Sequence, residues 1–233
     1  MSLAVGHGEA TIHHHHSLLQ AFQSLLTIVV IALFILTFTA QPYRIPSASM
    51  EPTLLVGDFL LVNKEVSTSH FSALAPAGLI RRGDLIVFHF PVHPSLHLVK
   101  RVVGLPGDRL RLRDGCVLID GHALSEPYAF YRPSAAESYR DDFPRMDHAD
   151  PAVDSRWWVQ MHSLVRNGEL TIPPDSYFVL GDNRNNSDDS RYWGLVPRAA
   201  IVGKPFVIYF SLKEPAVSLT KLARWERTLR IVR

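Results

Sequence analysis

The segment from Ser17 to Tyr43 contains no Asp, Glu, Lys or Arg, and a charge-free run of this length limits what the chain can fold into. Its most apolar part extends from Leu25 to Phe38. Because a helix needs roughly 20 mainly apolar residues to cross a bilayer, the segment predicts a transmembrane anchor. A cleaved signal peptide would begin with basic residues, and here no Lys or Arg precedes Arg44. The alternative is a helix buried in a protein core.

The remainder of the chain has short apolar runs that alternate with turn signals such as Val56-Gly57-Asp58 and Pro106-Gly107-Asp108. This spacing is typical of antiparallel β-sheet, so we expect a mainly β fold. Strands are predicted at residues 59–62, 84–88, 99–103, 110–112, 117–119, 177–180 and 201–210.

Two stretches depart from this pattern. Residues 124–170 mix charged, aromatic and Pro residues without a clear period and predict an inserted subdomain. Residues 213–233 combine basic and apolar residues, which predicts an amphipathic helix either on anionic lipid or packed on the protein surface. Four aromatic residues of the insertion are expected to form a small core of their own: Tyr128, Tyr131, Trp157 and Trp158.

The composition limits the partners and the redox chemistry. A formal net charge of +2 is too small to indicate nucleic acid binding. Cys116 is the one cysteine, so no internal disulfide can form. Because it precedes Val117-Leu118-Ile119, we expect it to be a small buried hydrophobic residue. We assign no metal role to the run His13–His16.

Three blocks stand in order along the chain: Ser47-Ala48-Ser49-Met50-Glu51-Pro52-Thr53-Leu54, then Leu98 to Asp108 with Lys100-Arg101, then Gly181 to Gly194. In this order they resemble the bacterial type I signal peptidases (leader peptidases), over about residues 44 to 210. The resemblance implies a membrane-bound serine endopeptidase that removes signal peptides from exported preproteins after small-x-small sites. It implies no cofactor and no metal. The implied partners are secreted preproteins and the lipid bilayer, without nucleic acid.

The implied fold is an N-terminal transmembrane helix followed by an antiparallel β-sheet catalytic domain of the signal-peptidase type with an inserted subdomain. The implied location is the bacterial inner membrane, single-pass, with the catalytic domain on the outer (periplasmic) face. Arg44 beside the anchor weakly favours the opposite orientation, but long domains largely escape the positive-inside rule. The predicted segments are a tail (1–16), the anchor (17–43), the first part of the catalytic core (44–123), the insertion (124–170), the second part of the core (171–212) and a basic C-terminal segment (213–233).

The implied chemistry is a Ser-Lys dyad, with Ser49 as nucleophile and Lys100 as general base. A serine hydroxyl is a poor nucleophile until a base removes its proton. Lysine can be that base only when neutral, and its ordinary pKa is about 10.4. Burial penalises the ammonium form and lowers the pKa. The apolar neighbours of Lys100 in the sequence suit such burial: Leu98, Val99, Val102 and Val103.

The resemblance also implies supporting roles. The backbone N–H of Ser49 and the hydroxyl of Ser47 would stabilise the oxyanion, and Ser187 would orient Lys100. Asp189 and Arg191 would pair with each other or with Arg101 to hold the lysine loop. Ala48 and Asn185 depart from the family pattern, which often has glycine and aspartate at these positions. Residues expected to line the substrate pockets are Ile45, Pro46, Met50, Leu54 and Val99.

Two other functions are compatible with parts of the sequence. The self-cleaving repressors of the SOS response also use a Ser-Lys dyad on a related β fold, but they carry a DNA-binding domain in place of an anchor. A membrane-tethered β module that binds envelope partners would leave Ser49 and Lys100 without a chemical role. Loss of activity in Lys100→Ala would separate the peptidase from such a module.

Overall fold

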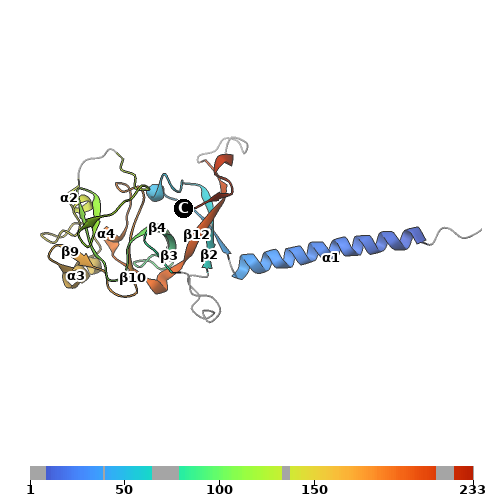
Figure 1. The fold of residues 1–233 in the computed structure, drawn as a ribbon, viewed down its shortest axis with the longest axis horizontal. Helices are drawn as coiled ribbons and strands as arrows, with labels where there is room; N and C mark the ends of the chain where they lie inside the picture. The colour runs from blue at the N-terminus through green and yellow to red at the C-terminus, as the bar shows by residue number, and fades with distance from the viewer. Residues whose placement is uncertain (1–8, 39, 65–78, 133–136, 214–222, 233) are drawn as a thin grey trace, which may run out of the picture. The chain divides into compact units, whose positions relative to one another are not determined.

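The computed structural model describes residues 9–38, 40–64, 79–132, 137–213 and 223–232 of the chain (Figure 1). The chain divides into two compact units, Met1–Gln41 and Pro42–Arg233. The first unit contains one long helix, and the second contains the β domain.

The helix of the first unit is α1, Glu9–Phe38. Within the described part of the chain, no helix combines the length and the apolar character that crossing a membrane requires. The predicted transmembrane helix over residues 17–43 is therefore not found.

The second unit is mainly β, as predicted, and its larger sheet has the strand order β1-β2-β12-β3-β4-β10-β11, with β13 also pairing with β12. The pairs of β12 with β2, β3 and β13, and of β4 with β3 and β10, are antiparallel. The strands are β1 Ala40–Arg44, β2 Asp58–Asn63, β3 Leu85–His89, β4 His97–Gly104, β10 Ser176–Leu180, β11 Val196–Pro197, β12 Ile201–Ser211 and β13 Arg230–Ile231.

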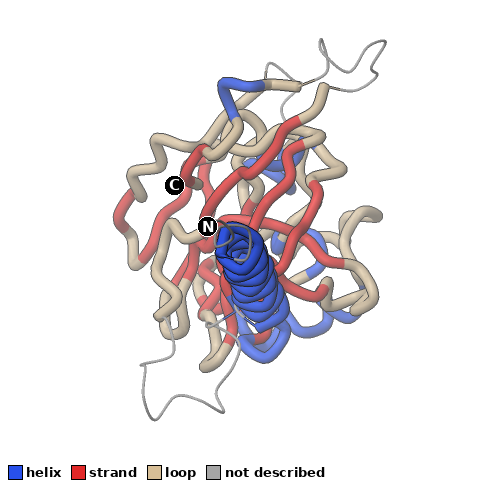
Figure 2. The backbone as a smooth tube through the Cα atoms, turned by 90° about the vertical axis from the view of Figure 1, so that its right-hand side faces the viewer, coloured by secondary structure: helices blue, strands red, loops and turns tan. Residues whose placement is uncertain are grey.

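A smaller antiparallel sheet has the order β7-β6-β5-β9-β8. Together the two sheets make strands the main element of this unit (Figure 2). Every strand predicted from the sequence is present in one sheet or the other. The smaller sheet consists of β5 Arg109–Arg113, β6 Cys116–Ile119, β7 His122–Ala123, β8 Val165–Arg166 and β9 Glu169–Thr171. Its strands come from both sides of residue 124, where the sequence predicts that the insertion begins.

Burial follows from strand position. In β2, buried and half-buried residues alternate, as expected where one face of a sheet covers a core. In β3, which lies between β12 and β4, the first four residues are all buried. The next strand, β4, is buried over its last five residues, from Lys100 to Gly104. Lys100 is buried because it lies in this central part of the sheet.

Short helices cover the smaller sheet, and they lie with it at one end of the β domain (Figure 1). These are α2, Ser138–Asp141, and α3, Ser155–Leu164. The side chain of Asp154 caps the start of α3 by accepting hydrogen bonds from the backbone N–H groups of Arg156 and Trp157. A third short helix, α4, Ser190–Trp193, belongs to the third sequence block.

The expected small aromatic core is only partly present. Trp157 is 2% exposed and belongs to a cluster with Met161 and Phe143, and Trp158 packs against that cluster. Tyr128 and Tyr131 instead lie against arginine side chains, as described below. The prediction for these two residues is wrong because the Tyr128 ring contacts Arg101 of the second block and the Tyr131 ring lies near Arg184 of the third block.

Two further predictions are wrong. Cys116 is exposed, because its side chain at the start of β6 points to solvent. Over residues 223–232, the C-terminal segment is not an α-helix and contains a short 3-10 turn at Trp225–Arg227 and β13. Pairing of β13 with β12 and a positive φ of 61° at Leu229 interrupt any helix there. Residues 214–222 lie outside the described part of the chain.

Trp157→Ala should lower the free energy of unfolding by about 3–5 kcal/mol, because it removes a large fully buried side chain and leaves a cavity. Urea denaturation measures the change. Val159 on the same helix is 69% exposed, and Val159→Ala should stay within about 0.5 kcal/mol of the parent protein. Equal effects of the two substitutions would contradict the assignment of Trp157 to the core.

Candidate active site

The first block forms a tight turn that presents Ser49. Residues Ala48–Met50 make one 3-10 turn after Ser47, whose backbone is extended. Ile45 and Met50, before and after the serine, are 4% and 1% exposed and anchor the turn in the core. Ser47 Oγ lies 3.4 Å from Ser49 Oγ. Ala48 is not among the described residues with positive φ, so an alanine fits where the family often has glycine.

Lys100 is the buried lysine of the site. It pairs with Ile86 of β3 in the central part of the larger sheet and is 3% exposed. Desolvation lowers its pKa from the ordinary value to about 8. The carboxylates of Asp189 and Asp188 act in the opposite direction, and Arg191 lowers the pKa further. The apolar surroundings predicted from the sequence therefore have the expected effect on the lysine.

One small pocket is lined by both Ser49 and Lys100. No hydrogen bond between the two side chains is among those of the described residues, and catalytic hydrogen bonds often tighten only when substrate is bound. Of the five residues expected to contact substrate, Leu54 is not in the pocket lining, because it is fully buried beside Leu60 in the core. The other four line the pocket: Ile45, Pro46, Met50 and Val99.

The third block docks directly on the nucleophile turn. The backbone N–H of Asn183 donates to the carbonyl of Ser49 at 3.1 Å, and its side-chain Nδ2 donates to the carbonyl of Ala48 at 3.0 Å. Asn183 is fully buried. Sequence reasoning missed this residue, although it lies within the quoted block.

Gly181 allows this close approach. A Cβ atom at this position would lie 2.5 Å from the carbonyl oxygen of Ser49 and 2.2 Å from Ser187 Oγ. Ser187 is therefore beside the nucleophile turn. Its Oγ is buried and has no hydrogen-bond partner among the described residues. A buried hydroxyl without a partner is costly, so it is available to a group that enters or moves within the site.

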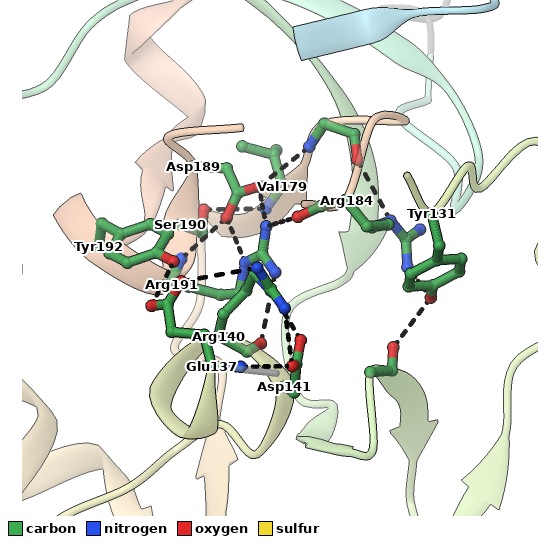
Figure 3. Close-up of polar contacts among 12 residues, drawn as sticks. Tyr131, Glu137, Arg140, Asp141, Val179, Arg184, Asp189, Ser190, Arg191 and Tyr192 are labelled. Atoms are coloured by element: carbon green, nitrogen blue, oxygen red, sulfur yellow. Dashed lines mark hydrogen bonds and ion pairs between the residues drawn. The ribbon is translucent and has the colours of Figure 1, made fainter. Parts of the chain in front are cut away.

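Two buried ion pairs surround Lys100. Asp189 pairs with Arg191 through two bonds of 2.8 Å, as expected (Figure 3). Burial alone would raise the pKa of Asp189, but Arg191 outweighs that effect and lowers it. Arg101 does not pair with Asp189 and instead forms a bidentate pair with Asp182, at 2.8 and 2.7 Å. Asp182 is a further site residue that sequence reasoning missed.

The start of the insertion supports the same loop. The Tyr128 ring lies 4.0 Å from the guanidinium carbon of Arg101, a cation–π contact. Glu126 forms a buried bidentate pair with Arg184, which also donates to the hydroxyl of Tyr131 at 3.4 Å (Figure 3 shows this last contact). No motif in residues 124–170 pointed to these roles, since they depend on where the insertion folds.

Comparisons with known proteins identify the family of this chain. The family model described as "Signal peptidase, peptidase S26" matches residues 18–210, which is most of the chain. The chain belongs to the peptidase S26 family. It is therefore a serine peptidase, a hydrolase, and the resemblance carried by the three blocks is confirmed.

Several relatives in this family are named signal peptidase I. The proteins of Pseudomonas fluorescens and Aquifex aeolicus are each 36% identical, with coverage of 84% and 83% of this chain and 74% and 85% of theirs. The protein of Bacillus licheniformis is 30% identical, over 88% of this chain and 96% of its own. A solved signal peptidase I of Enterococcus faecalis is 34% identical with a TM-score of 0.40, and covers 55% of this chain and 97% of its own.

Gly181→Ala should lower turnover by about 100-fold, because its Cβ must push the Ser49 turn and Ser187 apart. Steady-state cleavage of a preprotein measures this. Gly121→Ala is the control, since its Cβ meets nothing within 4 Å although its φ is +82°. That variant should retain turnover at a modest cost in stability. Full activity of Gly181→Ala would contradict the proposed close contact.

Proposed function

We propose that this peptidase removes signal peptides from exported preproteins by a Ser49–Lys100 dyad and cuts after small-x-small sites. The observation that carries the proposal is the buried Lys100, with its pKa lowered to about 8, in the pocket that also contains Ser49. The resemblance and the names of the relatives support the choice of substrate.

The ion pairs explain why a buried lysine can be neutral beside several carboxylates. Asp182 is paired with Arg101, and Asp189 is paired with Arg191. Each pair has little net charge, so the field of its carboxylate on Lys100 is partly cancelled. Desolvation then decides the pKa of the lysine.

In the proposed reaction, Ser49 Oγ attacks the carbonyl carbon of the scissile bond while neutral Lys100 Nζ accepts the serine proton. The oxyanion is stabilised by the backbone N–H of Ser49 and the hydroxyl of Ser47, which lies 3.4 Å from Ser49 Oγ. The lysine ammonium then protonates the leaving amine, the C–N bond breaks, and an acyl-enzyme remains. Lys100 next takes a proton from water, which attacks the ester, and the serine recovers its proton as the signal peptide leaves.

Ser187 is proposed to orient the base. Its buried hydroxyl can hydrogen-bond Lys100 Nζ when the amine moves toward Ser49. Asp189 and Arg191 hold the loop that carries this serine, because Asp189 Oδ2 also accepts from the backbone N–H of Gly181 at 3.2 Å.

The pocket supports selection for small residues. Its apolar lining includes Ile45, Met50 and Val99, and both Ile45 and Met50 are held almost completely buried. A shallow pocket with fixed walls excludes bulky side chains. The substrate is proposed to bind as an added strand, because an extended peptide can pair with an exposed sheet edge. Location on the outer face of the inner membrane, beside the lipid bilayer, stays a prediction from the resemblance.

Ser49→Ala and Lys100→Ala should each abolish cleavage of a purified preprotein, since one removes the nucleophile and the other the base. Ser187→Ala should reduce turnover less than Ser49→Ala does, because Ser187 only orients the lysine. Gel assays with N-terminal sequencing of the product measure both rate and cut site. Cleavage that survives Lys100→Ala would remove lysine as the base. A cut site without small residues would contradict the proposed specificity.

Turnover should rise with pH through an apparent pKa near the value of about 8 for Lys100. The sign follows from the chemistry, because the ammonium form below this pKa has no lone pair to accept the serine proton. The dependence of the single-turnover rate constant on pH between 6 and 10 tests this prediction. A flat profile would contradict the assignment of Lys100 as the base.

A further inference from the structure

The loop between Ser49 and β2 is fixed by two sets of hydrogen bonds, and both involve Thr53. Thr53 lies four positions after Ser49 in the same loop. Its Oγ1 donates to Asp182 Oδ2 at 2.5 Å, and its carbonyl accepts from Arg227 Nη2 at 3.0 Å. One residue therefore joins the nucleophile loop to the catalytic loop and to the C-terminal 3-10 turn.

Through its hydroxyl group, Thr53 is connected to Lys100 by two intervening residues, Asp182 and Arg101. Asp182 Oδ2 accepts a hydrogen bond from Thr53, and both carboxylate oxygens of Asp182 accept hydrogen bonds from Arg101. Arg101 follows Lys100 directly on β4, and it is also fixed by the carbonyl of Gly83 at 2.6 Å. Asp182 and Arg101 are 0% and 3% exposed, so water cannot easily replace a lost bond.

Through its carbonyl group and Arg227, Thr53 is connected to the carboxylate of Asp58, which is fully buried. Arg227 pairs with it through Nε at 3.1 Å and Nη2 at 2.5 Å, and Ser211 Oγ donates to the same carboxylate at 2.5 Å. Arg224 donates to Ser211 Oγ at 2.8 Å and to the carbonyl of Val56 at 3.0 Å. Arg224 and Arg227, near the C-terminus, thus bind the loop that follows Ser49.

We propose that Thr53, held in place by Arg227, is a positioning residue that fixes the Ser49 turn relative to the Lys100 strand. The inference rests on the proposed function for its effect on turnover, but the geometric coupling is independent of that function. Thr53 and Arg227 do not line the Ser49 pocket. They act on the distance between nucleophile and base and not on substrate binding.

The central test compares Thr53→Val with Thr53→Ser in the full chain. Valine keeps the shape of threonine without its hydroxyl, and serine keeps the hydroxyl. Thr53→Val should lower kcat by about 10- to 100-fold with KM within about twofold of the parent protein, and Thr53→Ser should restore most of kcat. A purely structural role would change the midpoint of thermal unfolding and leave kcat of the folded enzyme unchanged.

A second readout does not depend on activity. The backbone N–H of Asn183 donates to the carbonyl of Ser49, so its hydrogen exchange reports whether the nucleophile turn stays docked. Exchange at Asn183 should be about 10-fold faster in Thr53→Val than in Thr53→Ser, which follows from a loss of the bond beside it. Unchanged exchange overturns the inference even if the parent protein cleaves preproteins. If the parent protein cleaves no preprotein, the proposed function is wrong. Hydrogen exchange at Asn183 still tests whether Thr53 holds the Ser49 turn in place.

The role of Arg227 is tested by a double-mutant cycle with Arg227→Lys, which keeps a cation beside Asp58. If Arg227 acts through Thr53, its effect on kcat should be at least about threefold smaller in the Thr53→Val background than alone. Arg230→Lys is the matched control, because Arg230 is exposed on β13, and it should leave kcat unchanged. Independent effects of Arg227→Lys and Thr53→Val would overturn the part assigned to Arg227.

Discussion

The burial of one lysine in the centre of a sheet is the constraint on which the rest of the site depends. Lys100 occupies β4 between β3 and β10, where desolvation lowers its pKa to about 8. A carboxylate left unpaired at that depth would hold the lysine charged. The structure avoids this by giving each deeply buried carboxylate near it an arginine: Asp182 with Arg101 and Asp189 with Arg191.

These pairs are structural as well as electrostatic. Removing one partner of a buried ion pair leaves an uncompensated charge, which typically costs about 3–5 kcal/mol. Each pair also fixes a loop: Asp182 binds Thr53 beyond the nucleophile, and Asp189 binds the backbone of Gly181. The same interactions that let desolvation lower the pKa of Lys100 therefore also hold these loops in place.

Much of this arrangement could be predicted. Short apolar runs between Gly- and Pro-containing turns predict the strands, and each of these strands is present. The three blocks pointed to Ser49, Lys100 and Ser187 as candidate site residues, and of the two pairings left open for Asp189 and Arg191 the structure shows the one between them. Predictions that depended on a single segment were weaker. The C-terminal segment was predicted as a helix from its composition alone, and its residues 223–232 instead contain a 3-10 turn and β13.

By itself, the sequence determined the family and the β class and supplied the candidates for the proposed dyad, because these depend on local pattern and on order along the chain. Only the tertiary structure decided which charges meet. Asp182 with Arg101, Glu126 with Arg184 and Asp58 with Arg227 are separated by 81, 58 and 169 positions. No local period records such pairs, since they form when strands and loops distant in the chain are packed together. The same packing turned a basic C-terminal segment, predicted as a helix, into a support for the nucleophile loop.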